Sequence, residues 1–144
     1  VSMGAATVLM ASGEDLPENV KAVIADCGYT SEWDEFQREA DTLHIPWFPV
    51  LNATSVLSKI RDGYDFKQAS ALAQVKKSHI PTLFIHGSSD ELVPYSMLGE
   101  LYAAAACEKE ELTVEGAGHA LSSSVAPTLY WRTVEDFIAK YLDR

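Results

Sequence analysis

The chain has 144 residues, 47% of them hydrophobic and 22% charged, a composition typical of one globular domain. This apolar content excludes a disordered chain, and no run approaches the roughly 20 apolar residues that a bilayer-spanning helix requires. Eleven basic against 21 acidic residues give a net charge of −10. Because phosphate backbones and anionic membrane surfaces would both repel this charge, we expect neither nucleic acid nor such a membrane as a partner.

The first half of the chain predicts helices around one buried strand. Residues Gly4–Ala11 are small and apolar throughout, which indicates a buried helix. The branched, apolar run Val20–Ala25 predicts a strand. Three further helices are expected before residue 80, with the bounds Ser31–Leu43, Val50–Ile60 and, capped by Asp65, 65–75.

The second half predicts two more strands, Thr82–Ile85 and Leu112–Val114, each bounded by turn or charged residues. A helix from Pro94 or Tyr95 to Ala106 is expected between them, and Pro127 fits the first turn of a last helix. Helices that alternate with strands imply βαβ units. The sequence therefore predicts an α/β fold with parallel strands flanked by helices.

The two cysteines are too few for a disulfide framework, so we expect Cys27 and Cys107 to be free thiols. No signal peptide is visible at the start of the chain. Because the chain begins with Val1 rather than Met, we expect part of the protein to lie upstream.

Three glycine-containing segments follow the predicted strands, and each offers an acid or an imidazole. They are residues 26–29 (Asp-Cys-Gly-Tyr), 86–90 (His-Gly-Ser-Ser-Asp) and 116–119 (Gly-Ala-Gly-His). In parallel α/β sheets the chemistry lies at the carboxyl ends of the strands. We therefore expect these segments to meet at one edge of the sheet.

Three motifs resemble those of the α/β-hydrolases. Val1-Ser2-Met3-Gly4 matches the last four positions of G-x-S-x-G, the nucleophile elbow, whose first glycine would fall before residue 1. Residues 86–94 resemble the H-G-x-x-D-x-x-V-P loop, and residues 116–119 resemble the histidine loop. The order Ser, Asp, His also matches that fold. The resemblance covers the whole chain but only the C-terminal half of the family's domain, and residues 26–31 and 114–119 are most similar to bacterial cell-surface hydrolases.

The resemblance implies a role for each motif residue. Ser2 would be the nucleophile, His119 the general base and then acid, and Asp90 the group that orients the imidazole. The backbone N–H of Met3 would be one oxyanion donor, while the second would come from an earlier loop of the family's domain. Taken singly, Ser2 could be a helix N-cap, Asp90 a turn carboxylate and His119 a loop residue, but their order at three strand ends favours the triad.

Asp26 is the alternative acid, because it also follows a predicted strand. The fuller motif around Asp90 favours Asp90, and Asp26 is then expected to cap a helix or bond the nearby loop backbone. We expect His86 to support the acid loop. His44 and His79 lack ligand spacing, so we expect neither a metal site nor a cofactor.

Four aromatic residues lie in a segment of about residues 31–78, which we expect to be helical and cap-like within a single domain. They are Trp33, Phe36, Trp47 and Phe48. Such a group is explained either as helix core or as a cap that forms the substrate pocket. The resemblance favours the second explanation, since family insertions in this region shape the acyl pocket.

The expected activity is that of a carboxylesterase-like serine hydrolase, which would cleave a small-molecule ester or thioester through an acyl-enzyme. The alternative is a non-catalytic piece of the fold that serves as a binding or assembly module. The strand Val20–Ala25 would leave an unpaired edge, which a missing N-terminal half or a second copy would cover. Without that neighbouring strand, we expect Ser2 to be mobile and its elbow relaxed.

Overall fold

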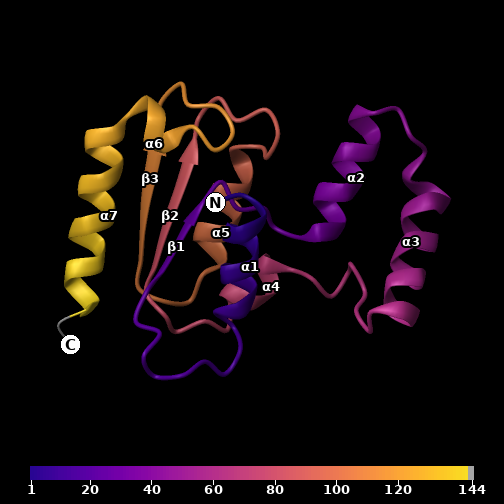
Figure 1. The fold of residues 1–144 in the computed structure, drawn as a ribbon, viewed down its shortest axis with the longest axis horizontal. Helices are drawn as coiled ribbons and strands as arrows, with labels where there is room; N and C mark the ends of the chain where they lie inside the picture. Colours follow the sequence, from indigo (N-terminus) through magenta and orange to yellow (C-terminus); the bar gives the residue numbers. More distant parts are fainter. Residues whose placement is uncertain (143–144) are drawn as a thin grey trace.

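The computed structural model describes residues 1–142, and its centre is a parallel three-stranded sheet (Figure 1). The strands β1 (Val23–Asp26), β2 (Thr82–Gly87) and β3 (Lys109–Val114) lie in the order β1-β2-β3. Thr82 of β2 is in register with Val23 and with Lys109. The predicted α/β class with parallel strands is confirmed.

The strands differ from the prediction mainly at their starts. β1 begins at Val23 rather than at residue 20, because β2 begins only after Pro81, whose carbonyl accepts the N–H of Val23 at 2.9 Å. Within residues 1–142, no strand lies beside the residues before Val23 on that side. β3 begins at Lys109, earlier than the apolar run Leu112–Val114, because main-chain pairing with β2 does not need apolar side chains.

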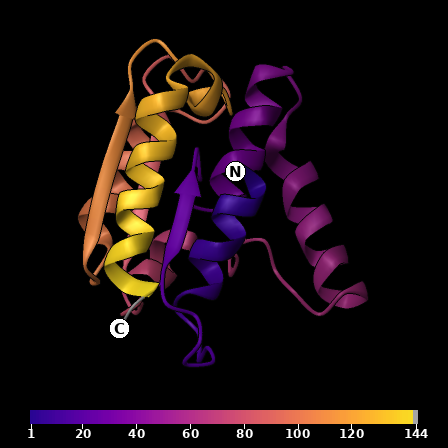
Figure 2. The ribbon, with the colours of Figure 1, turned by 60° about the vertical axis from the view of Figure 1, so that its left-hand side comes forward.

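Helices cover both faces of the sheet (Figure 2). One face carries α1 (Met3–Ala11), α4 (Ala71–Val75) and α5 (Ser96–Ala104), and the other carries α7 (Pro127–Leu142). Burial on both faces explains why all of β2 is buried. The two cores are formed by Ala5, Leu9, Val23, Phe84 and Leu101 on the first face and by Leu83, Ile85, Val114, Val134 and Phe137 on the second.

Small residues bring α1 close to the end of β1. Ala5 and Ala6 are completely buried, and a Cβ on Gly28 would already approach the Ala5 Cβ to 3.3 Å. This close packing positions the start of α1, and therefore Ser2, against the carboxyl end of β1.

Helices α2 (Glu32–Thr42) and α3 (Trp47–Arg61) form a hairpin set to one side of the sheet (Figure 1). The Ser31 Oγ caps α2 by accepting the N–H of Asp34 at 3.0 Å. The role of residues 31–78 as a cap remains a prediction.

One helix was predicted with the wrong start, and another was not predicted. The helix expected over residues 65–75 begins only at Ala71, with Ser70 as its cap. Asp65 instead accepts the N–H of Lys67, which closes a local turn. The short helix α6 (Ser122–Val125) was missed, because a serine-rich segment of this length carries no apolar periodicity.

Within residues 1–142, the helices are too short or too polar to span a bilayer. Cys27 is a buried free thiol and Cys107 a partly buried one, as the sequence predicted. The partner of the free edge of β1 remains a prediction.

Candidate active site

Ser2 lies at a sharp turn between the chain start and α1. Its φ of 54° and ψ of −123° are unusual for a residue other than glycine. The N–H of Ser2 donates to the carbonyl of Asp26 at 2.8 Å, and the N–H of Gly4 donates to the carbonyl of Val1 at 3.0 Å. The expectation of a relaxed elbow is therefore wrong in this structure, because β1 and the packing of α1 hold the turn.

The carboxylate of Asp90, in the loop after β2, is fully buried and surrounded by donors. Its Oδ1 accepts the N–H groups of Leu92 at 3.0 Å and Val93 at 2.9 Å. Its Oδ2 lies 2.9 Å from the Nδ1 of His119 and 3.3 Å from the Nε2 of His86. Such a set of donors fixes the orientation of the carboxylate toward His119.

His119, in the loop after β3, connects the acid to the serine. Its Nε2 lies 2.8 Å from the Ser2 Oγ. A carboxylate can only accept hydrogen bonds, so the Nδ1 facing Asp90 carries the proton and Nε2 is left to accept one from the hydroxyl. The geometry thus brings together Ser2, His119 and Asp90 in the arrangement that abstraction of a hydroxyl proton requires.

Hydrogen bonds donated by backbone N–H groups fix the acid loop against the histidine loop. The N–H of Gly116 donates to the Ser88 Oγ at 2.9 Å, and the N–H of Ser89 donates to the carbonyl of Ala117 at 3.0 Å. At Gly87, an added Cβ would lie 2.2 Å from the Ala117 carbonyl oxygen. This close approach requires glycine and sets the spacing between the two loops.

Asp26 is hydrogen-bonded to side chains of α6 and α7. Its Oδ1 accepts the Ser122 hydroxyl at 3.3 Å, and it is also hydrogen-bonded to Tyr130. Burial raises the pKa of its carboxyl, while these two hydrogen bonds oppose that shift. The pKa of Tyr130 is raised to about 12, first by burial and second by the nearby charge of Asp26.

The sequence did not reveal that Cys27 and Ala120 shape the site through their backbone conformation. Among the described residues other than glycine, those with positive φ are Ser2, Cys27, Ala120 and, in the α2–α3 turn, His44. Such strain is stored at functional sites when the surroundings enforce it. No residue-type pattern signals a left-handed cysteine or alanine, so only the backbone shows that these positions shape the site.

The four predicted pocket residues do not form a single cluster. Phe36 and Trp47 line an apolar cavity of about 300 Å³ between α2 and α3, together with Leu51 and Phe66. Trp33 lies elsewhere, with the Lys67 ammonium over its ring at 4.3 Å from the ring centroid. The ring of Phe48 contacts that of Trp47, but its side chain lines a separate surface hollow on α3 and is 66% exposed.

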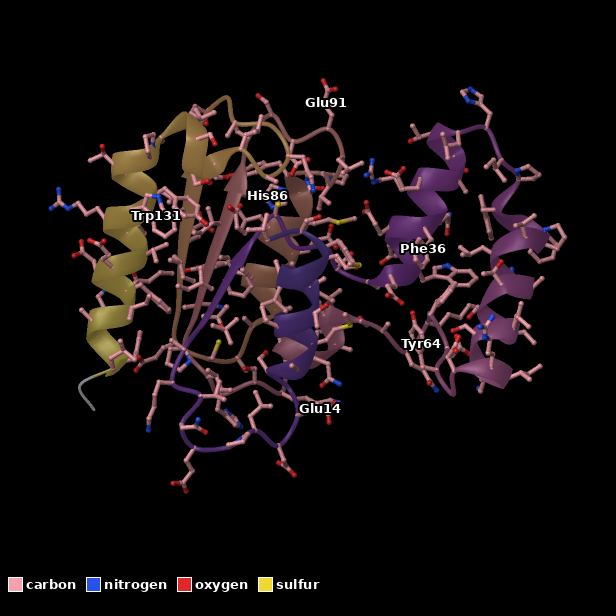
Figure 3. The ribbon with its side chains drawn as sticks, viewed as in Figure 1. Glu14, Phe36, Tyr64, His86, Glu91 and Trp131 are labelled. Carbon is pink, nitrogen blue, oxygen red and sulfur yellow. The ribbon has the colours of Figure 1, made fainter. Side chains whose placement is uncertain are left out.

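Helix α2 also contacts the acid loop. The Arg38 Nη1 donates to the carbonyl of Glu91 at 3.4 Å, and its Nη2 pairs with Glu35 at 3.3 Å. Burial raises the pKa of Glu35, although Arg38 opposes the shift. Figure 3 shows Phe36 and Tyr64 on the α2–α3 side of the molecule, with His86 in the sheet region and Glu91 on the loop above it.

Comparison with known proteins matches the whole of residues 1–144 to a model of the prolyl oligopeptidase family. The chain belongs to this family. It is 31% identical over 140 residues to the uncharacterized protein YqkD of Bacillus subtilis, which covers 95% of this chain and 45% of that protein. The chain thus spans about half the length of this relative.

Solved structures that resemble this member of the prolyl oligopeptidase family include an esterase domain and a peptidase. An esterase domain from a Rhodothermus marinus protein has a TM-score of 0.68 at 17% identity, over 97% of this chain and 59% of that one. Pyrococcus horikoshii acylaminoacyl peptidase has a TM-score of 0.71 at 16% identity, over 100% of this chain and 23% of that one. At these identities the likeness concerns the fold, and it confirms the α/β-hydrolase fold that the motifs indicated.

Proposed function

We propose that the protein is a serine hydrolase that cleaves a carboxylic ester or thioester through an acyl-enzyme. The observation that carries this proposal is the imidazole of His119, which lies 2.8 Å from the Ser2 Oγ and 2.9 Å from the Asp90 Oδ2. Membership of the prolyl oligopeptidase family and the likeness to an esterase domain support hydrolysis as the general chemistry.

In the acylation step, the Ser2 Oγ attacks the substrate carbonyl carbon while its proton passes to the Nε2 of His119. The imidazolium that forms is stabilised by Asp90, whose carboxylate four donors hold in place. Protonated Nε2 then donates its proton to the leaving alcohol or thiol as the tetrahedral intermediate collapses.

In the deacylation step, His119 accepts a proton from water as the water attacks the acyl-enzyme, and then returns it to the Ser2 Oγ. The negative oxygen of each tetrahedral intermediate needs hydrogen-bond donors. Met3 is the first residue of α1, where backbone N–H groups point out of the helix end. We therefore assign the N–H of Met3 as one oxyanion donor, with the positive end of α1 adding to the stabilisation.

The substrate pocket is the second part of the proposal. The apolar cavity lined by Phe36 and Trp47 suits an acyl chain, because its walls are almost wholly hydrocarbon. The contact between Arg38 and the carbonyl of Glu91 links α2 to the loop that carries Asp90. We propose a small-molecule ester as the substrate, with neither cofactor nor metal needed for turnover.

A fluorophosphonate probe tests this function directly. The full-length protein is incubated with the probe, and the adduct is located by peptide mass spectrometry. We expect a single adduct on Ser2 that disappears in Ser2→Ala and persists in Ser124→Ala, an exposed serine of α6. A folded protein that hydrolyses p-nitrophenyl esters but carries no adduct on Ser2 would overturn the proposal and favour the alternative of a binding module for this chain.

A further inference from the structure

The thiol of Cys27 has no role in the proposed hydrolysis, yet it lies within the site. Cys27 follows β1 and is 1% exposed. One potential ligand atom from each of Cys27, Asp90 and His119 lies within 4.8 Å of the other two. The three residues follow the carboxyl ends of three different strands, so the sheet itself brings a thiol, a carboxylate and an imidazole together.

The backbone directs the thiol into this position. Cys27 has a φ of 49°, and the backbone of Ser2 and Ala120, themselves at positive φ, lies close to its thiol. The carboxylates of Asp26 and Asp90 lie close enough to the thiol to interact with it electrostatically. A bound cation would supply the positive charge that a thiolate needs in this acidic setting.

The donor set matches the preference of thiophilic divalent cations. Zn²⁺ is bound tetrahedrally by cysteine sulfur at about 2.3 Å, by histidine nitrogen at about 2.0 Å and by carboxylate oxygen at about 2.0 to 2.2 Å. These bond lengths place ligand atoms roughly 3.3 to 3.7 Å apart in a tetrahedral site. Shifts of about 1 Å would therefore bring the three side chains into coordination. The His119 side chain is 20% exposed, which leaves a route from solvent to a fourth ligand, water.

We propose that Cys27, Asp90 and His119 form an inhibitory binding site for a thiophilic divalent cation such as Zn²⁺. The cation takes the Nδ1 of His119, the nitrogen that faces Asp90, and the thiol proton is released to solvent. The imidazole proton moves from Nδ1 to Nε2, which can then no longer accept the proton of Ser2. The inhibition rests on the proposed function, whereas the binding does not.

Cd²⁺ serves as a spectroscopic probe of binding, because cadmium–thiolate coordination gives an ultraviolet charge-transfer band. In Cys107→Ala, Cys27 is the remaining thiol of this chain. We expect this variant to develop the band with a stoichiometry of one, and Zn²⁺ to suppress it by competition. A native Cys107→Ala protein without the band would overturn the proposal, and this test does not require any Cys27 variant to fold.

Inhibition is measured as p-nitrophenyl ester hydrolysis by the full-length protein, relative to the metal-free rate of each variant. Zn²⁺ is expected to inhibit wild type and Cys107→Ala equally, with reversal by EDTA, and its midpoint is expected to rise at least tenfold in Cys27→Ala or Cys27→Ser. Equal midpoints in folded Cys27 variants would overturn the proposal. Failure of the fluorophosphonate to label Ser2 would instead overturn the hydrolase, while the cadmium band would still report on the cation site.

Discussion

His86 and Asp90 share a buried contact, with 3.3 Å between the Nε2 of His86 and the Oδ2 of Asp90. The same Nε2 lies 3.0 Å from the carbonyl oxygen of Val93. Since that carbonyl can only accept, Nε2 carries the proton and is shared between the two oxygens. His86 therefore holds both the acid and the turn that follows it, as the sequence suggested for the support of this loop.

Replacing His86 by phenylalanine tests this support. The ring keeps its approximate volume, but the buried oxygens of Val93 and Asp90 lose a donor. An unsatisfied buried group costs about 1 to 3 kcal/mol, so we expect the free energy of unfolding to fall by about this amount. Urea denaturation measures it, and His79→Phe, at an exposed position, is the control with an expected change within about 0.5 kcal/mol. An equal loss in both variants would contradict the supporting role.

The nucleophile and the base are expected to act as a unit. Ser2→Ala or His119→Ala in the full-length protein should each lower kcat for ester hydrolysis by up to about 10⁶-fold, and the double variant should lose little more. Steady-state kinetics checks this, with circular dichroism to show that the fold is kept. Multiplicative losses in the double variant would mean that the two side chains act independently.

The choice of Asp90 over Asp26 gives a second kinetic test. Asp90→Asn can present an NH2 donor in place of the carboxylate oxygen that keeps the proton on the Nδ1 of His119, so kcat is expected to fall on the order of 10⁴-fold. Asp26 contacts Ser122 and Tyr130 instead, and Asp26→Asn should lose far less. A larger loss at Asp26 than at Asp90 would show that Asp26 is the acid.

The sequence predicted the main elements because their buried positions coincide with the apolar pattern of the sequence. β2 is buried at all six positions, and the apolar run in its sequence predicted it. The motifs also placed Ser2, Asp90 and His119 at three strand ends, and parallel strands bring such ends together. These predictions depend on local pattern and on simple topology.

The sequence could not predict features that depend on contacts between distant segments. The elbow stays formed because the N–H of Ser2 donates to the carbonyl of Asp26. No local sequence pattern predicts this hydrogen bond. The predicted aromatic cluster is divided because Trp33 contacts Lys67, whereas Phe36 packs against Phe66. Helix α4 starts late because Asp65 closes a turn with Lys67.

Gly87 offers a steric test of the spacing between the acid and histidine loops. A methyl group at this position would lie 2.2 Å from the carbonyl oxygen of Ala117, so one loop must move. We expect Gly87→Ala to lower the free energy of unfolding by about 1 to 3 kcal/mol and to lower kcat as well. Gly99→Ala in α5 is the control, because its Cβ meets nothing within 4 Å, and it should be neutral or stabilising by up to about 1 kcal/mol. A neutral Gly87→Ala would show that the loop spacing is adjustable.

The buried carboxyl of Asp26 predicts a pH dependence of stability. Burial raises its pKa above the ordinary value of 3.8, so the folded protein keeps this proton to a higher pH than the unfolded chain. The contribution of Asp26 to stability is therefore fully present below about pH 3.8 and is lost as the pH rises through the folded pKa. Asparagine does not titrate, so the free energy of unfolding of Asp26→Asn minus that of wild type is expected to increase from pH 4 to pH 7. Urea denaturation of both proteins across this range measures the difference, in which shared titrations cancel. A difference that stays constant or decreases would show that the hydrogen bonds from Ser122 and Tyr130 balance or outweigh the burial of the charge.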